Sequence, residues 1–145
     1  MVKQALFLLL SLLFFINNSH AQGKIVANIH DLKNNEGTCI ACLFNNASAF
    51  NGDDGQPIKC FTANIRHFAS QIVFTNIEAG EYAIKVFHDE NNNKKIDRNF
   101  LGIPKEGYGA SLNKLRFAAA PSYHDNIFLL HNDSTKVLRI KLRYL

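Results

Sequence analysis

Residues 71–88 read QIVFTNIEAGEYAIKVFH, and this stretch decides which class of fold the sequence predicts. Two apolar segments, 71–77 and 82–88, flank a short polar segment at 78–81 that contains a glycine. Two such segments joined by a short glycine turn are typical of a β-hairpin. In the second segment every other side chain is large and apolar, as in a strand that buries one face: Tyr82, Ile84 and Val86.

Strand patterns continue on both sides of this stretch. Residues 24–32 alternate between apolar and polar, and residues 38–44 are apolar on both faces, as in a central strand covered on both sides. Weaker patterns cover 58–65 and 126–131. Residues 136–144 alternate most cleanly, which predicts that Leu138, Ile140, Leu142 and Tyr144 face inward and that Arg139, Lys141 and Arg143 face water.

About seven strands and no substantial helix predict an all-β fold, a two-sheet β-sandwich with Greek-key connections. Two longer segments are predicted to be irregular. Residues 45–57 are polar and rich in Asn, Gly and Asp, which favour loops. Residues 100–120 contain several glycines and a proline, which block a long helix.

The first 21 residues are predicted to be a secretory signal peptide and not part of the fold. Lys3 supplies a positive start, residues 5–16 form an apolar run too short to span a bilayer, and residues 19–21 end in a small-x-small cleavage site. Residues 22–145 are then predicted to form a single domain that is periplasmic or secreted.

The charge balance gives no reason to expect a nucleic-acid partner. The formal net charge is +4, and it falls to +3 when Lys3 is removed with the signal peptide. Residues 22–145 contain no second apolar run of spanning length, so no membrane span is expected. The partners that remain are an envelope glycan or another protein.

Three cysteines follow the signal peptide: Cys39, Cys42 and Cys60. Cys39 and Cys42 form a C-x-x-C pattern, but in a strand two residues three apart point to opposite faces and lie about 10 Å apart. Neither a disulfide between them nor a redox-active pair is therefore expected. One structural disulfide from Cys60 to either Cys39 or Cys42 is predicted, with one thiol left over.

The clearest candidate for a metal site begins directly after residue 88. Asp89, Asn91, Asn93 and Asp97 occupy positions 1, 3, 5 and 9 of a loop, and the main-chain carbonyl of Lys95 falls at position 7. Such hard oxygens on a compact loop predict bound Ca²⁺. The loop is not an EF-hand, because position 6 is lysine and position 12 is phenylalanine. With two carboxylates and two amides as side-chain ligands, a modest affinity is expected. The alternative is a plain turn held by its own Asn and Asp side chains.

Four residues near this loop form a second candidate binding site: His88, Glu90, Glu106 and Tyr108. The two glutamates could complete a cation's ligand shell, whereas Glu106 and Tyr108 could line a shallow site for a sugar or a peptide. Alternatively, Tyr108 lies between two glycines and packs over the end of the sheet. The histidine spacings match no common zinc pattern, and no nucleophile elbow surrounds a serine.

Several segments together resemble a bacterial family of exported proteins known as domain-of-unknown-function family number 2141. They are residues 77–84 (IEAGEYAI), 88–97 (HDENNNKKID), 101–109 (LGIPKEGYG), 121–126 (PSYHDN) and 142–144 (LRY). The family usually has glycines in the form N-G-N-G where this chain has Asn92, Asn93 and Lys94. The resemblance implies a secreted or periplasmic domain without an assigned activity. The Gly-x-Tyr strand and the loop after it are also similar to prealbumin-like and collagen-adhesin repeats, which implies an immunoglobulin-like or prealbumin-like sandwich.

Residues 88–109 contain no nucleophile–base pair and no phosphate-binding glycine loop, which favours an exported structural or binding module of the envelope over an enzyme. The alternative is a small enzyme that acts on envelope carbohydrate, with Glu90 or Glu106 and His88 as the acid–base groups. A third interpretation is a subunit whose unpaired edge strand completes the sheet of a partner.

Overall fold

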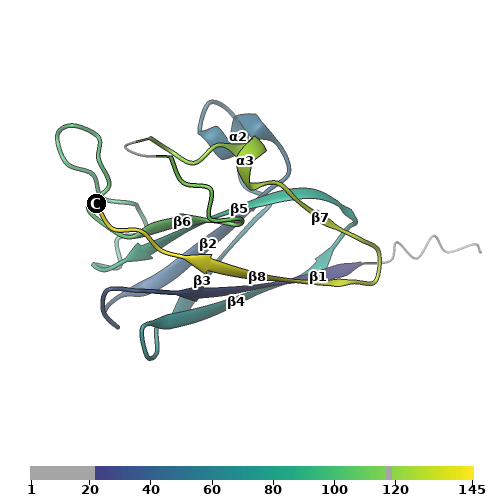
Figure 1. The fold of residues 1–145 in the computed structure, drawn as a ribbon, viewed down its shortest axis with the longest axis horizontal. Helices are drawn as coiled ribbons and strands as arrows, with labels where there is room; N and C mark the ends of the chain where they lie inside the picture. Colours follow the sequence, from purple (N-terminus) through teal and green to yellow (C-terminus); the bar gives the residue numbers. More distant parts are fainter. Residues whose placement is uncertain (1–21, 117–118) are drawn as a thin grey trace, which may run out of the picture.

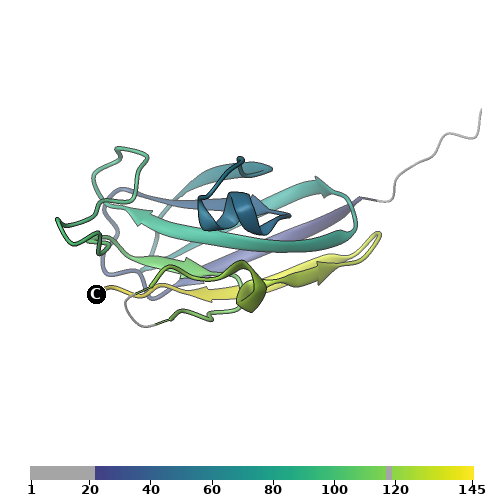
Figure 2. The ribbon, with the colours of Figure 1, turned by 90° about the horizontal axis from the view of Figure 1, so that it is seen from above.

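The computed structural model describes residues 22–116 and 119–145, so the predicted signal peptide lies outside the described residues. Two β-sheets pack face to face, and their strands run roughly along the long axis of the molecule (Figures 1 and 2). This arrangement confirms the all-β, two-sheet sandwich, with eight strands in the described residues where about seven were expected.

The three-stranded sheet has the order β4-β1-β8. Strand β1 (Gly23–His30) lies in the middle, antiparallel to β4 (Ala69–Ile77) and parallel to β8 (Thr135–Lys141). The alternation predicted for residues 24–32 is confirmed, because the inward-facing residues are at most 1% exposed: Ile25, Ala27 and Ile29.

The C-terminal strand is shorter than predicted, because β8 ends at Lys141. Its inward side chains are buried as expected, and Arg139 and Lys141 are exposed. The prediction that Arg143 faces water is wrong. Arg143 is half-buried, and its guanidinium donates to the main-chain oxygens of Leu115 and Arg116 at 3.3 and 3.2 Å, because that segment passes over it.

The five-stranded sheet has the order β3-β2-β5-β6, with β7 paired to the start of β5. Its central strands are buried on both faces, which explains why residues 38–44 are apolar throughout. Its members are β2 (Thr38–Phe44), β3 (Lys59–Asn64), β5 (Gly80–Asp89), β6 (Tyr108–Ala110) and β7 (Phe128–Leu130).

The hairpin predicted at residues 71–88 is wrong, although both of its strands exist. Strand β4 pairs with β1 in one sheet, and β5 pairs with β2, β6 and β7 in the other. Residues 78–79 therefore carry the chain across the sandwich. Phe74 and Ile84, both fully buried, consequently lie in opposing sheets of one core. Alternation fixes which face of a strand is buried, but it does not say whether the next strand joins the same sheet.

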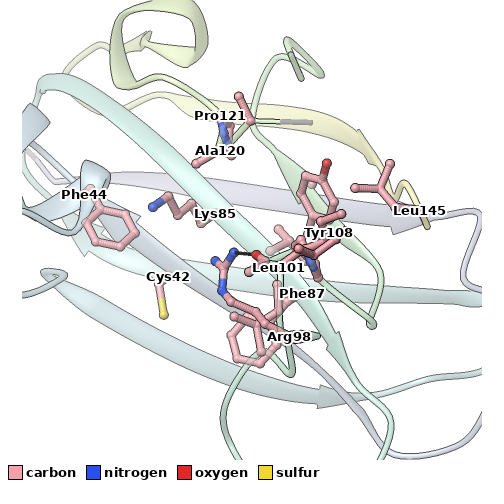
Figure 3. Close-up of a pocket in the computed structure, with 17 residues that line it drawn as sticks. Cys42, Phe44, Lys85, Phe87, Arg98, Leu101, Tyr108, Ala120, Pro121 and Leu145 are labelled. Atoms are coloured by element: carbon pink, nitrogen blue, oxygen red, sulfur yellow. Dashed lines mark hydrogen bonds between the residues drawn. The ribbon is translucent and has the colours of Figure 1, made fainter. Parts of the chain in front are cut away.

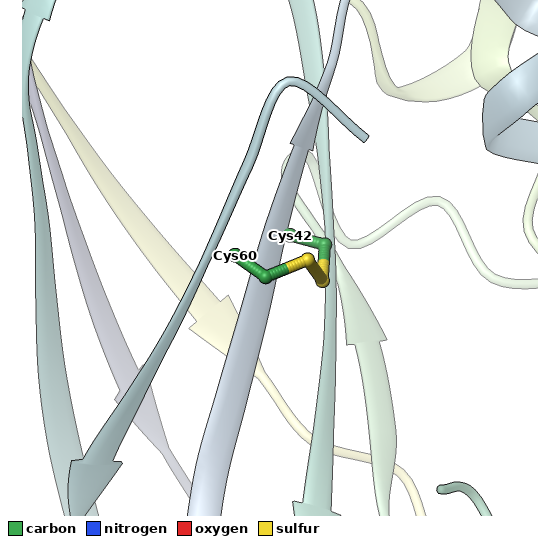
Figure 4. The surroundings of a disulfide bond; sticks show 2 residues. All are labelled: Cys42 and Cys60. Atoms are coloured by element: carbon green, nitrogen blue, oxygen red, sulfur yellow. A yellow bond between two sulfur atoms is a disulfide. The ribbon is translucent and has the colours of Figure 1, made fainter. Parts of the chain in front are cut away.

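The disulfide joins Cys42 to Cys60, which face each other directly across β2 and β3 with Cα atoms 4.1 Å apart (Figure 4). Cys39 is a free thiol on the opposite face of β2, buried in the core. The prediction that Cys39 and Cys42 point to opposite faces is therefore confirmed. The sequence allowed Cys60 to pair with either Cys39 or Cys42, and in the structure it pairs with Cys42, which faces outward.

Two short helices cover the outer face of the five-stranded sheet (Figure 1). The first of them lies within residues 45–57, which were expected to form a loop throughout. Helix α2 (Ala47–Asn51) begins at Asn46, whose side chain accepts the main-chain N–H of Ala49 at 2.9 Å. It buries Phe50 in an outer apolar cluster with Phe44 and Tyr123, the latter from α3 (Tyr123–Asn126). Helices of five and four residues are too short to show a periodic pattern, and neither could span a bilayer.

Candidate functional site

The oxygen-rich loop, residues 89–97, starts where β5 ends. The side chain of Asp89 is fully buried, and its two carboxylate oxygens accept the main-chain N–H groups of Asn93 at 3.0 Å and Lys94 at 2.8 Å. Asn92 and Lys94 have positive φ angles of 59° and 62°. Glycine adopts this backbone region most easily, which fits the glycines that the resembling family carries in this loop.

Of the predicted ligand side chains, Asn91 and Asn93 gather around Asp97, whereas the Asp89 carboxylate accepts from main-chain N–H groups instead. The amide nitrogens of Asn91 and Asn93 donate to the two carboxylate oxygens of Asp97 at 2.7 and 3.0 Å. The amide oxygens of the same two residues accept the main-chain N–H groups of Asn93 and Lys95 at 3.1 and 2.8 Å. The loop is therefore a closed network in which every one of these oxygens meets an N–H group.

A calcium ion would require this network to rearrange in part. Calcium takes six to eight oxygen ligands, and the N–H groups now directed at Asp97 would have to turn away. Rotation of the Asn91 and Asn93 amides would present their oxygens in place of their nitrogens. Within residues 22–116 and 119–145 no three His, Cys, Asp or Glu side chains are grouped to hold a metal, so amide and main-chain oxygens would have to complete the shell.

Glu106 fastens both ends of the oxygen-rich loop. Its side chain is 4% exposed, and its carboxylate oxygens accept the main-chain N–H of Glu90 at 3.0 Å and of Asp97 at 2.9 Å. The Glu90 carboxylate lies at the surface side of the loop and accepts from the amide of Asn34 at 3.1 Å. Glu106 therefore positions the loop, with both of its oxygens engaged.

His88 is fully buried and links three distant segments. Its Nε2 donates to the main-chain oxygen of Glu36 at 2.7 Å, which leaves Nδ1 to accept from the Tyr144 hydroxyl, also at 2.7 Å. The Tyr144 hydroxyl in turn accepts the main-chain N–H of Lys33 at 3.0 Å. At Gly37 any side chain would overlap the backbone of residues 89–90, so the loop that contacts His88 requires glycine there.

Tyr108 lies apart from this network and lines a groove on the outer face of the five-stranded sheet (Figure 3). This outer groove has a volume of about 310 Å³. Its floor comes from β2, β5 and β6, and its walls come from residues 96–104 and 119–121, with Leu145 at one end. The lining is mostly apolar, and Leu101, 67% exposed, marks the side on which the groove opens to solvent.

Two cationic side chains, Lys85 and Arg98, are the charged side chains of the outer groove. The Lys85 ammonium donates to the main-chain oxygen of Phe50 and lies 4.5 Å from the centre of the Phe50 ring. Burial lowers the pKa of Lys85, the positive charge of Arg98 lowers that pKa further, and Asp53 opposes both. Arg98 is exposed and donates to the main-chain oxygen of Gly102 at 2.8 Å, the hydrogen bond drawn in Figure 3.

Neither of these two cations was among the residues predicted to form a site. The local sequence could have indicated Lys85, because it is a charged residue between Ala83 and Phe87 on the outward face of its strand. Arg98 lies on another segment of the chain, and no feature of the surrounding sequence indicated that it belongs to the same groove. Of the four residues predicted to bind a ligand, the structure brings Tyr108 into the groove and places His88 and Glu106 beneath the loop as buried anchors.

A model of a bacterial protein family described as "Uncharacterized protein conserved in bacteria (DUF2141)" matches residues 27–138. The match covers most of the sandwich, the oxygen-rich loop and most of the outer groove. No curated protein and no solved structure gave a significant match.

Proposed function

The chain belongs to the DUF2141 family of bacterial proteins, and from this premise we propose that it is an exported, non-catalytic binding module of the cell envelope whose ligand occupies the outer groove. The observation that carries the proposal is the groove itself. Its volume of about 310 Å³ and its apolar lining, with a few polar groups, are typical of small-molecule sites.

The state of the candidate acid–base groups supports a binding module over the enzyme that uses Glu90 or Glu106 with His88. A general acid or base must reach the proton it transfers. Both ring nitrogens of His88 and both oxygens of Glu106 are engaged within the fold, and neither side chain is more than 4% exposed. Both groups are therefore better suited to holding the loop than to meeting a substrate.

The oxygen-rich loop has a role in this proposal as the support of one groove wall. It runs directly into residues 96–104, which supply Ile96, Arg98 and Leu101 to the lining. A calcium ion bound by Asp89, Asn91, Asn93, Asp97 and the Lys95 carbonyl would stiffen that wall. The disulfide and the predicted signal peptide support an oxidising location outside the cytoplasm.

Binding of a neutral apolar dye tests whether the outer groove accepts a ligand. We expect Nile red to gain fluorescence with the folded protein and Leu101→Ser to weaken its binding about tenfold, since the change removes an apolar side chain from the groove. Leu129→Ser is the matched control, because Leu129 is an exposed leucine of β7 that is not part of the lining. Equal losses in both variants, or no dye binding at all, would contradict the proposal.

Thermal unfolding with and without calcium tests the loop separately. With calcium at about 100 times its dissociation constant, we expect the unfolding free energy to rise by about 2.7 kcal/mol over the value in excess chelator. Asp97→Ala should abolish this increase, whereas Asp53→Ala, which removes an exposed carboxylate from a different loop, should retain it. An unchanged midpoint in millimolar calcium would show that the hydrogen-bonded network is the working form of the loop.

A further inference from the structure

We propose that the ligand of the outer groove is a medium-chain carboxylate of the fatty-acid type, with its carboxylate at Arg98 and Lys85 and its chain along the apolar floor. This inference rests on the proposed function, since it names the class of ligand for the same groove.

The charged side chains of the groove are both positive. Among the residues that the structure describes, its lining contains the ammonium of Lys85 and the guanidinium of Arg98 and no Asp or Glu side chain. Among the described residues the ion pairs involve His30 and Lys141 with Asp31, and Arg116 with Asp125, so neither groove cation forms an ion pair with a carboxylate. Asp53 raises the pKa of Lys85 from outside the lining and only partly opposes burial and Arg98. The hydrogen bonds found for the two cations go to neutral main-chain oxygens. An anion at this point would supply the missing counter-charge.

Arg98 is the better placed of the two to take a carboxylate. A guanidinium has five N–H donors in a planar fork and binds carboxylates through two parallel hydrogen bonds. One donor is used for Gly102, so others remain for a ligand. Both cations lie to the left of Tyr108 in Figure 3, as Phe44 does, whereas Leu145 lies to its right, so apolar side chains lie on both sides of the two cations.

The remainder of the lining selects an apolar chain. Phe44, Phe87 and Leu101 present hydrocarbon to the groove. Within 22–116 and 119–145, the neutral polar side chains of the lining are Tyr108 and the disulfide-bonded Cys42. A peptide would bring main-chain N–H and C=O groups that need partners of their own, and unpaired polar groups are costly to bury. A saturated hydrocarbon chain has no polar groups that need hydrogen-bond partners.

The size of the groove sets the length of the chain. At roughly 30 Å³ for each small group, 310 Å³ corresponds to about ten non-hydrogen atoms. The ten carbons of decanoate match this number, with the two carboxylate oxygens placed at the cations, so decanoate is a suitable probe, and decanol is the matched neutral molecule with the same chain.

Calorimetric titration of the purified mature chain with decanoate and decanol tests the inference. We expect decanoate to bind at least tenfold more tightly than decanol. Arg98→Met should weaken decanoate binding about tenfold and leave decanol unchanged, and it should fold normally because Arg98 is exposed. Arg139→Met, which removes an exposed arginine from β8, should change neither affinity. Lys85→Met is a second test of the charge, with its fold verified by thermal unfolding.

Three outcomes would overturn the inference, and they are distinguishable. Equal affinity for decanoate and decanol would leave a groove that binds apolar molecules without regard to charge. Tighter binding of an N-acetylated apolar peptide with a free C-terminus, in competition with decanoate, would identify a peptide carboxylate as the ligand. Failure of decanoate, decanol and Nile red alike would reject the proposed function together with the inference.

Discussion

Replacing both Cys42 and Cys60 with serine is expected to lower the free energy of unfolding by about 3 kcal/mol. The disulfide closes a segment with a sequence separation of 18 residues. Loss of its constraint on the unfolded chain accounts for about 3 kcal/mol at 25 °C for a loop of this length. That is a large part of the total stability of a small domain, which is about 5–15 kcal/mol.

Because the disulfide joins β3 to β2, its removal is also expected to loosen β3 locally. Strand β3 lies at the edge of its sheet and pairs with β2 alone. Most of its side chains are exposed, so apolar burial contributes little to holding it. Its side-chain contacts with the core include Phe61, which lies 5.3 Å from Phe74 between ring centres, and the partly buried Ala63. Amide hydrogen exchange in β3 should therefore rise more than in β1 when the disulfide is removed.

Denaturant unfolding of the wild type and the double variant measures the loss of unfolding free energy. The reactivity of Cys39 separately checks that Cys42 and Cys60 are the paired cysteines. Burial raises the pKa of the Cys39 thiol to about 12, partly opposed by a hydrogen bond to Ser70. Under non-reducing conditions at about pH 8, iodoacetamide should therefore modify one thiol per molecule and only after unfolding. Modification of the native protein, or a loss below about 1 kcal/mol in the double variant, would contradict the expectation.

Local patterns predicted the strands well, because alternation reports directly which face of a strand is buried. Ile25, Ala27 and Ile29 required no knowledge of the rest of the fold. The hairpin prediction was wrong because strand pairing, unlike burial, depends on distant parts of the chain. The segment 78–79 joins strands in two different sheets, and that choice depends on β1 pairing with β4 and β2 pairing with β5. These pairings are long-range, so the turn alone could not reveal them.

The oxygen-rich loop was only partly predictable. The spacing of Asp89, Asn91, Asn93 and Asp97 placed these side chains correctly on one compact loop. It could not reveal that Glu106 holds both loop ends, because that contact needs the return of the chain through β6. The outer groove was hidden for the same reason: Lys85, Arg98 and Pro121 meet only after three separate segments pack together.

The largest effect is expected from Asp89→Ala, which should lower the free energy of unfolding by about 3–6 kcal/mol. The carboxylate is fully buried and accepts two main-chain N–H groups at 3.0 and 2.8 Å. A hydrogen bond to a charged group contributes about 1.5–3 kcal/mol, so the two together give this range. The N–H groups of Asn93 and Lys94 would also lose the acceptor that holds residues 92 and 94 in their left-handed conformation.

Denaturant unfolding in excess chelator isolates this effect, because calcium then contributes nothing. Glu78→Ala, which removes an exposed carboxylate from the turn between the sheets, is the matched control and should stay within about 0.5 kcal/mol of wild type. Asp89→Asn should fall between the two, since its amide retains one acceptor oxygen and loses the charge. A cost below about 1 kcal/mol for Asp89→Ala would mean that water replaces the carboxylate at both N–H groups. In that case the loop, and the groove wall that follows it, would have to be held mainly by Glu106.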